Sequence, residues 1–453
     1  MRDSDAPPGG IADLRPLDRA REQKAWYWYD WANSAYVTTI ATVMFAPYLI
    51  GIAENAAVDD RVDVLGLAVA PGSLPSYLVT FSTILSAVVL PPLGAMMDRT
   101  EHKKQWLAGF AWVGAAFASL LFFCRGDNWE IGAVAVVGAN LCLAASMVVN
   151  DSILPLISEE HERDRVSSRG WAFGYLGGGL LLAANLALVT LLPFGLDEAA
   201  AARISMLSAA LWWAGFTVIP FVRLRNHPPV DVAPATGNAV TRSFGQLAAT
   251  LRDMKNYPMA LTFLLAYLFF NDGIQTVIAS SSTYGSEQLG FGQSVLIATI
   301  LIVQFVAFGG ALLFGRLAAR LGAKRTILMG LGLWMVIVTV ALFLPERSLV
   351  PFLALGVGIG IVLGGTQALA RSYFSLLIPR GKEAEYFSFY HAMDRGTSWF
   401  GTLVFGLVYQ FTGSYRPAIF ALIAFFVLGG LLLMRVDTER GIRDAGNERP
   451  AVL

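Results

Sequence analysis

Long apolar stretches separated by short charged loops constrain this chain more than any other feature of its sequence. We count twelve such stretches, each about 20 residues long or longer, the length that an α-helix needs to cross ~30 Å of hydrocarbon. Only helices and closed barrels satisfy their backbone hydrogen bonds in lipid, and the alternating hydrophobicity of barrel strands is absent. The sequence therefore predicts an all-α membrane protein with twelve spans, at 25–52, 74–97, 105–123, 130–155, 169–193, 203–223, 257–283, 293–315, 326–345, 349–377, 385–411 and 416–436.

The composition excludes a soluble protein. Of the 453 residues, 55% are hydrophobic and 15% are Asp, Glu, Lys or Arg, against about 25% charged residues in soluble domains. The net charge is zero, so no nucleic-acid partner is expected. The first 24 residues are polar, which predicts no cleavable signal peptide. The lipid bilayer is thus the expected surrounding of this chain.

Lys and Arg are distributed unequally between the two sides that twelve spans would create. With the N-terminus inside, 27 of the 33 fall on the cytoplasmic side, five fall in outer loops, and Arg395 lies inside a span. Because positive residues accumulate in cytoplasmic loops, both termini are predicted to be cytoplasmic. We expect a multi-pass protein of the bacterial inner membrane.

The longest break between spans divides the chain into two halves of six. We predict an N-terminal tail at 1–24, a first six-helix bundle at 25–223, a cytoplasmic linker at 224–256, a second bundle at 257–436 and a C-terminal tail at 437–453. Within the linker, Phe244, Leu247, Leu251 and Met254 share one helical face. This pattern fits either a short helix on the membrane surface or a flexible linker.

One loop pattern occurs in both halves with a constant offset of 221 residues. Its positions are Gly94, Asp98, Arg99, Lys103 and Lys104 in the first half, and Gly315, Ala319, Arg320, Lys324 and Arg325 in the second. Parallel repeats of six spans are a transporter architecture in which the substrate lies between the halves. The fold prediction is therefore two six-helix bundles around a central site.

This loop resembles the signature loop of the major facilitator superfamily. The resemblance implies that the loop stabilises one state of a rocking cycle through salt bridges. The second copy has Ala319 where an acid is usual, so only the first copy carries the full set of charges.

Further segments resemble the vacuolar-effluxer-like branch of that superfamily, which is named for autophagy-related vacuolar amino-acid exporters of fungi. These segments are Tyr29–Tyr36 in span one, Ser168–Gly179 in span five, Asn271–Thr276 in span seven, and Gly364–Ala368 with Arg371 and Ser372 in span ten. The resemblance implies export of a small polar metabolite, with amino acids as the favoured class. Glycines four apart in span five resemble a motif of exporters, or else they only allow close helix packing.

Ionisable side chains inside the spans are the candidate functional groups, since each costs about 2.5–3.5 kcal/mol in hydrocarbon. Asp272 lies 15 residues after Tyr257, which places it ~22 Å into the membrane. With Asn271 and Gln275 beside it, Asp272 is a candidate for binding a substrate amine, for carrying a proton, or for a helix-packing hydrogen bond. Proton coupling through Asp272 is a hypothesis.

Spans one, ten and eleven contribute the other candidates. In span eleven Arg395 is expected either to bind a substrate carboxylate or to pair with Asp272, and Asp394 to find a partner on another helix. In span one Asp30, Asn33 and Ser34 are substrate or coupling candidates, although Asp30 could also pair with a cytoplasmic arginine. Gln367 lies one turn from Arg371, and Arg371 and Asp151 are assigned to the gate. His391 is interpreted as a proton sensor or a hydrogen-bonding core residue.

The sequence thus predicts a secondary transporter that functions as a monomer, with a small-molecule substrate and protons as a candidate coupling ion. No zinc-ligand spacing, nucleophile elbow or phosphate-binding loop occurs, so no metal, cofactor or catalytic residue is expected. Efflux of other metabolites or drugs is the nearest alternative. A polytopic membrane enzyme and a sensor that has lost transport are the alternatives from other classes.

Overall fold

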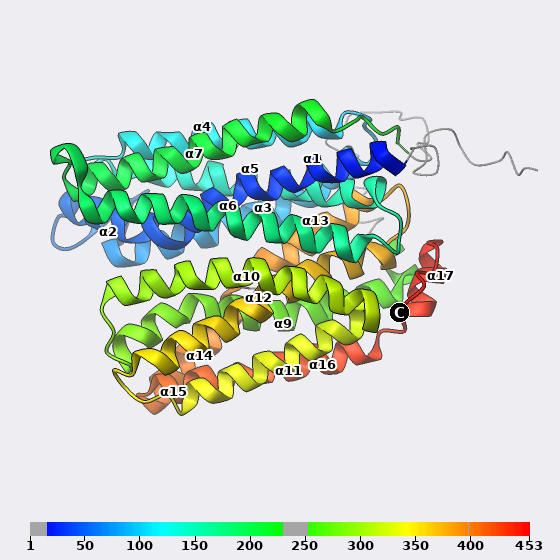
Figure 1. The fold of residues 1–453 in the computed structure, drawn as a ribbon. Helices are drawn as coiled ribbons and strands as arrows, with labels where there is room; N and C mark the ends of the chain where they lie inside the picture. The colour runs from blue at the N-terminus through cyan, green and yellow to red at the C-terminus, as the bar shows by residue number, and fades with distance from the viewer. Residues whose placement is uncertain (1–15, 230–251, 397) are drawn as a thin grey trace, which may run out of the picture.

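A computed structural model describes residues 16–229, 252–396 and 398–453, although a few side chains, among them that of Arg395, are outside the description. The helices run side by side along a common axis (Figure 1). The first half contains α1 (Pro16–Ala35), a π-helix η2 (Tyr36–Met44), α2 (Phe45–Ala56), strands β1 (Val62–Val64) and β2 (Leu67–Val69), η3 (Pro71–Ser73), α3 (Leu74–Met97), α4 (Lys103–Ser119), η4 (Leu120–Phe123), α5 (Trp129–Ile157), α6 (Arg163–Leu191), η5 (Pro193–Gly195) and α7 (Glu198–Arg223).

The second half repeats this order of long helices. It contains η6 (Met254–Asn256), α9 (Pro258–Thr283), the π-helix η7 (Tyr284–Gln288), α10 (Gln293–Leu321), α11 (Ala323–Leu342), α12 (Leu349–Leu377), α13 (Glu383–Gly396), α14 (Ser398–Thr412), α15 (Tyr415–Ala421), α16 (Ile423–Arg435) and α17 (Thr438–Ala445).

Within the described residues, eleven helical segments are long and apolar enough to cross a membrane. The twelfth predicted span, 385–411, corresponds to α13 and α14, which lie on either side of residue 397. The predicted all-α membrane fold is therefore confirmed, and the antiparallel hairpin β1–β2 is a small addition outside the spans. The exact bounds of the two predicted bundles stay a prediction.

The predicted ends of several spans need correction. The first span begins at Leu17 and not at 25, because the polar residues before Ala25 continue the helix beyond the apolar stretch. Likewise, α17 occupies part of the predicted C-terminal tail. The predicted surface helix with Phe244, Leu247 and Leu251 lies outside the described residues.

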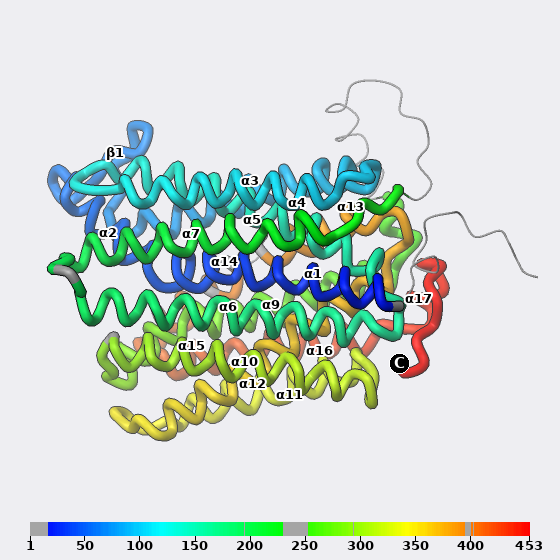
Figure 2. The backbone as a smooth tube through the Cα atoms, turned by 45° about the horizontal axis from the view of Figure 1, so that its top comes forward, coloured from blue at the N-terminus to red at the C-terminus, as the bar shows by residue number. Residues whose placement is uncertain are grey.

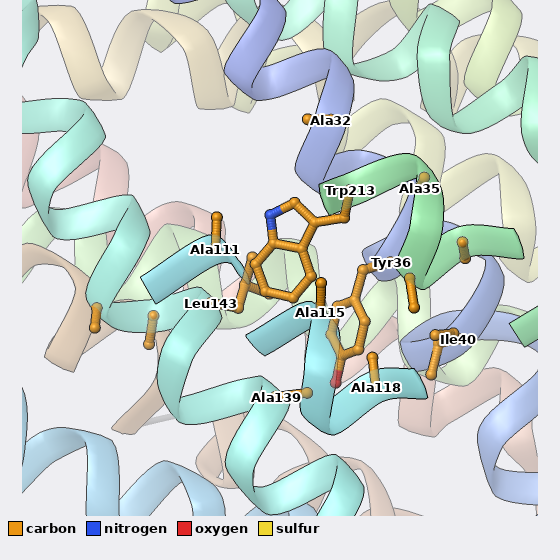
Figure 3. Close-up of a cluster of buried hydrophobic side chains, with 14 of the residues drawn as sticks. Ala32, Ala35, Tyr36, Ile40, Ala111, Ala115, Ala118, Ala139, Leu143 and Trp213 are labelled. Carbon is orange, nitrogen blue, oxygen red and sulfur yellow. The ribbon is translucent and has the colours of Figure 1, made fainter. Parts of the chain in front are cut away.

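Each half has its own hydrophobic core. The first core is built from α1 to α7, with Ala384 as its one member from the second half among the described residues, and the second core runs from Met254 to Val436. In the first core, small alanines of α4 and α5 surround the indole of Trp213 and the ring of Tyr36, whose centroids are 5.3 Å apart (Figure 3). Gly114 belongs to this packing, since a Cβ there would lie 2.5 Å from the Trp213 ring.

The two ends of the molecule differ. Figure 2 shows the start of α1 and the whole of α17 at one end, which we call the terminal end, and the β1–β2 hairpin at the other, which we call the hairpin end. Between the halves, α3 packs on α13, and α6 packs on α10 and α12.

The two repeat-related glycines both lie at this contact between halves. A Cβ on Gly94 would collide with the backbone carbonyl of Ala384, and a Cβ on Gly315 would lie 2.7 Å from the Ser168 side chain. The glycines of the repeated loop therefore allow the halves to approach at the terminal end.

Candidate substrate site

A central cavity of about 710 Å³ lies between the two halves. Its wall is drawn from α1, η2, α3, α5 and α6 in the first half and from α9, η7, α10 to α13 and α15 in the second. Lining residues towards the hairpin end, such as Ala41, Thr42 and Ser282, are exposed, whereas Asp151 and Arg371 at the opposite limit are buried. The cavity therefore opens towards the hairpin end and has a floor towards the terminal end.

Arg371 of α12 dominates this floor. Its side chain is 1% exposed, and its guanidinium binds Asp151 of α5 (Nη1 to Oδ1, 3.0 Å) and Asp30 of α1 (Nη2 to Oδ2, 3.2 Å). The Nε–H donates to the Ser167 hydroxyl at 2.9 Å. Trp26 adds a cation–π contact, with the guanidinium carbon 4.6 Å from its ring centroid. One arginine of the second half is thus held by two carboxylates of the first.

His391 of α13 completes what we call the charge cluster, which consists of Asp30, Asp151, Arg371 and His391. Its Nε2 lies 2.9 Å from Asp151 Oδ2, and the imidazole is buried. Asp151 therefore joins α5 to both α12 and α13. All four members are buried side chains near the floor of the cavity.

Gly170 of α6 makes room for this cluster. A Cβ at this position would collide with the Asp30 carboxylate and would lie 2.7 Å from the Trp26 ring. Gly174 and Gly178 continue the same face, where a Cβ would lie 2.6 Å from Ser34 Oγ and 2.9 Å from Thr38. The glycine pattern of span five thus brings α6 close to α1.

A second polar network lies on the second half. Gln367 Nε2 donates to Asn271 Oδ1 at 2.7 Å, and Asn271 Nδ2 donates to Asp394 Oδ1 at 2.6 Å. The Tyr267 hydroxyl also donates to Asp394, at 3.3 Å. Gln367, Tyr267 and Asp394 line the cavity, and Asn271 joins two of them from behind.

Asp272 lies elsewhere. It is buried, and its Oδ2 accepts the backbone N–H of Gly401 in α14 at 2.8 Å, while its Oδ1 has no hydrogen-bond partner among the described side chains. It does not line the cavity. In this structure its contact is thus a hydrogen bond between helices, which is one of the predicted alternatives, and its role in substrate binding or coupling stays a prediction.

The remaining span candidates divide into two groups. Asn33, Ser34 and Gln275 line the cavity, and Asn33 Nδ2 also donates to the Tyr29 carbonyl at 2.7 Å. Asp30 does not line the cavity and pairs with Arg371 of α12, and its part in substrate binding or coupling stays a prediction. The side chain of Arg395 is outside the described part, so its pairing is untested.

The terminal end is closed by contacts between the halves, which we call the seal. Asp98 accepts the backbone N–H groups of Ala384 and Glu385, each at 2.8 Å, at the start of α13. A carboxylate there satisfies unpaired helix N–H groups and faces the positive end of the helix dipole. Burial raises the pKa of Asp98 to about 6, while the Lys103 ammonium, 3.2 Å away, opposes that rise.

The second part of the seal joins α6 and the preceding loop to α12 and the loop after it. Arg163 Nη1 donates to the Ser375 carbonyl at 2.9 Å, and Glu160 pairs with Arg380 at 2.8 Å. The Ser372 hydroxyl donates to Asp164 at 2.6 Å. Although burial acts to raise the pKa of Glu160, the guanidiniums of Arg163 and Arg380 hold it below its ordinary value.

The lysines of the repeated loop contact their own half. Lys104 Nζ donates to the carbonyl of Leu224 after α7 at 2.9 Å, and Lys324 Nζ donates to that of Val436 after α16 at 2.7 Å. Each lysine thus binds the C-terminal end of the last long helix in its half. Arg99, Arg320 and Arg325 are exposed.

Several site residues were not among the sequence candidates. Ser167, Trp171, Tyr175 and Tyr390 touch the charge cluster or line the cavity, and His391 was left with two interpretations. The Gly170–Gly178 pattern was the available signal for the neighbours of α6, because it marks the face that packs on α1.

The chain matches known proteins over nearly its whole length. A family described as "Vacuole effluxer Atg22 like" matches residues 18–446. An uncharacterized MFS-type transporter, YxiO of Bacillus subtilis, is 29% identical over 435 residues, which cover 95% of this chain and 98% of YxiO. Autophagy-related protein 22-1 of Aspergillus fumigatus is 23% identical over 564 residues, covering 96% and 92% of the two chains.

Solved transporters share the fold. The proton:xylose symporter XylE superposes with a TM-score of 0.69 at 11% identity, covering 93% of this chain and 97% of XylE. A bacterial homologue of the iron transporter ferroportin in an outward-facing state gives a TM-score of 0.65 at 14% identity, covering 93% and 99% of the chains. At these identities the likeness concerns the arrangement of helices.

Proposed function

The chain belongs to the Atg22-like vacuole effluxer family of major facilitator transporters, which move small solutes across membranes, and from that premise we propose that it exports a small polar solute by secondary active transport. Export, as the direction of transport, is supported by the description of the matching family as effluxers and by the exporter-like glycine pattern of span five. Amino acids are the favoured substrate class because of the resemblance to vacuolar amino-acid exporters.

Alternating access is supported most directly by the position of the charge cluster. Arg371 and His391 come from the second half, and their partners Asp30 and Asp151 come from the first. Opening the terminal end would separate these partners and break the seal. The cavity would then close towards the hairpin end, and the solute would meet the opposite side.

The cavity suits a solute with both polar and apolar parts. Its volume of about 710 Å³ lies within the range of about 300–1,000 Å³ that is typical of small-molecule sites. Asn33, Gln275 and Gln367 offer uncharged hydrogen-bonding groups, whereas Val37, Leu143 and Ile278 belong to the apolar wall. Such a wall can hold an amino acid with a non-polar side chain.

Uphill export needs an energy source, and we assign it to a proton gradient. The sequence contains no nucleotide-binding loop. Buried acids and a histidine at the cavity floor are groups that can bind and release protons. Exchange of an outgoing solute for an incoming proton follows.

We place the protein in a bacterial inner membrane with both termini in the cytoplasm, so that the cavity faces outward. The excess of Lys and Arg on the side of the termini supports this orientation. We also propose that one chain is the transport unit, since the cavity is built within a single chain. Light scattering of the protein purified in detergent should give a protein mass that corresponds to one chain per complex.

Counterflow in proteoliposomes tests the transport proposal. Vesicles with purified protein are loaded with the standard amino acids at high concentration and diluted into a ¹⁴C-labelled mixture of them. The expected result is transient, saturable accumulation of label, absent from protein-free vesicles and from an Arg371→Ala variant. No accumulation above protein-free vesicles would overturn the assignment to amino acids.

A pH gradient tests the coupling in the same vesicles. Label should be driven against its concentration gradient when protons flow in the opposite direction. Counterflow that proceeds normally without any response to the pH gradient would overturn proton coupling while leaving the carrier intact.

A further inference from the structure

His391 stands at a contact between three parts of the molecule. Its Nε2 is 2.9 Å from Asp151 of α5, its ring lies 5.4 Å from that of Tyr390, and the residue lines the central cavity. It is therefore the one histidine, among the described residues, that touches both the cavity and a carboxylate of the opposite half. The other three histidines lie in loops.

The formal charges of the charge cluster do not balance while His391 is neutral. Asp30 and Asp151 contribute two negative charges and Arg371 one positive charge. Uptake of one proton by His391 brings the sum to zero. A buried net charge is costly, and one proton taken up by the cluster removes it. His391 lines the cavity from which that proton would come, whereas Asp30 does not.

Among the described side chains, no other titratable group around His391 supplies the missing charge. On its own helix these groups are Tyr390, Asp394 and, outside the described side chains, Arg395. From the packed helices they are Asp151 of α5, Arg371 of α12, Asp30 of α1 and Tyr267 of α9. The sequence of α3 has no charged residue between Leu74 and Met97, and that of α14 has none. Among the described groups, Arg371 is the permanent cation, and its guanidinium already serves two carboxylates.

We propose that His391 and Asp151 together form the site that carries the coupling proton, loaded from the cavity. This proposal rests on the proposed function, of which it names the proton-binding residues. A proton from cavity water binds the neutral imidazole, and the resulting imidazolium is held by the Asp151 carboxylate through Nε2–H. No other bond forms or breaks.

Release follows from the same geometry. When the terminal end opens, α13 moves away from α5, and the imidazolium loses both its carboxylate partner and its burial. Water on that side then accepts the proton. Asp272 cannot serve in this way, because it does not line the cavity.

The first test separates proton coupling from solute binding. His391→Gln keeps a hydrogen-bonding side chain of similar size but cannot be charged, and His161→Gln is the control, since His161 is an exposed loop residue beside Glu159. In vesicles with the ¹⁴C-labelled amino-acid mixture, His391→Gln should lower the ratio of the flux driven by the pH gradient to the counterflow at least tenfold. The control should keep the wild-type ratio. A wild-type ratio in His391→Gln would overturn the proposal.

The second test needs no substrate. Arg371 lies against the rings of Trp26 and Trp171, at 4.6 and 5.6 Å, so tryptophan emission reports on the charge of the cluster. In nanodiscs the tryptophan emission of the wild-type protein and of His161→Gln should change as the pH is varied. His391→Gln should lack this change. A titration that persists in His391→Gln, or is absent from the wild type, would overturn the proposal.

The two tests also separate this proposal from the proposed function. Absence of amino-acid counterflow in the wild type contradicts the substrate class, whereas the fluorescence titration still decides whether His391 binds the proton. If His391→Gln does not insert, Asp151→Asn takes its place, because an amide cannot stabilise the imidazolium as a carboxylate does.

Discussion

The Arg371 side chain shows how a single residue joins the two halves of this transporter. It is buried with two carboxylates, and its guanidinium also lies against aromatic rings. Removing one partner of such a pair leaves an uncompensated charge, which costs about 3–5 kcal/mol. Substitutions around Arg371 should therefore act on closure of the terminal end more than on the fold of either half.

Gly170→Ala should disrupt this cluster without changing any charge. The added methyl group would collide with the Asp30 carboxylate, and overpacking of this kind costs about 1–3 kcal/mol. We expect a lower melting temperature and loss of most counterflow. Gly215→Ala is the matched control, because Gly215 lies in a helix of the same half with no atom near its would-be Cβ. Equal behaviour of the two variants would contradict the role of Gly170.

Asp272→Asn should transport normally. Its carboxylate accepts the Gly401 N–H and does not line the cavity, and an amide oxygen can still accept that hydrogen bond. Flux driven by a pH gradient should stay within about twofold of the wild type. Asp272→Leu should instead lower stability by about 1–3 kcal/mol, because the buried N–H loses its acceptor. Loss of gradient-driven flux in Asp272→Asn, with counterflow intact, would make Asp272 the proton carrier.

At the scale of elements, the positions of the helices along the chain were predictable from the sequence. Which side of each helix packs against which neighbour was not. Hydrophobic length is a local property, so the predicted span 349–377 coincides with α12. The rise of 1.5 Å per residue gives the depth of Asp272 but not the direction in which its side chain points. In this structure the Asp272 side chain faces Gly401 of α14, a contact that the rise per residue could not predict.

Ion pairs between residues that are far apart in the chain could not be predicted from the sequence either. Asp30 was assigned to substrate or coupling, and Asp151 and Arg371 to the gate, yet the structure brings the three together. Asp30 and Arg371 are 341 residues apart, and their contact depends on how α1, α6 and α12 pack. Nothing in the local pattern around either residue encodes that packing.

Asp98→Ala should weaken the contact between α3 and the start of α13. The variant leaves two N–H groups at this helix start without their acceptor, and loss of a helix cap costs about 0.5–2 kcal/mol. The ratio of closed to open terminal ends should fall by about 2- to 30-fold.

Spin labels at Arg165 and Arg325, which are exposed on opposite halves, measure this ratio by pulsed EPR after the native cysteines are replaced. Glu101→Ala, an exposed change in the same loop, is the control. An unchanged distance distribution in Asp98→Ala would show that the cap does not hold the terminal end closed.

At the scale of the whole molecule, contacts within halves and contacts between halves have different partners. Lys104 and Lys324 bind helix ends of their own half, whereas Asp98, Arg163 and Arg380 bind across the seal. The halves can thus move apart at the terminal end without losing their internal contacts. The first copy of the repeated loop therefore makes both kinds of contact, within its half through Lys104 and across the seal through Asp98. The second copy has Ala319 in place of that acid.

The closed state should depend on pH through Glu160. Arg163 of the same half lowers the pKa of Glu160 whether or not the terminal end is closed, whereas Arg380 of the opposite half lowers it further only on closure. The part due to Arg380 stabilises closure fully above the ordinary value of 4.5 and is lost as the pH falls through the lowered pKa. Glu160→Gln lacks this contribution at every pH. At pH 7 its closed-to-open ratio should be about two- to fivefold below the wild type.

The difference between Glu160→Gln and the wild type should shrink as the pH falls below 4.5 and vanish below the lowered pKa of Glu160. The same pair of spin labels measures both proteins across the pH range, and Glu159→Gln is the control, since Glu159 pairs with Arg19 of its own half. A difference that grows on acidification would contradict the assigned sign.

The division of the charge cluster between halves has a consequence for biosynthesis. Asp30 and Asp151 leave the ribosome well before Arg371, which follows Asp151 by 220 residues. Until α12 inserts, the nascent first half holds two carboxyl groups within the bilayer and lacks the guanidinium that compensates them. A polypeptide that ends before α12 thus carries these two carboxyl groups without their guanidinium partner, even though its first six spans have all been made.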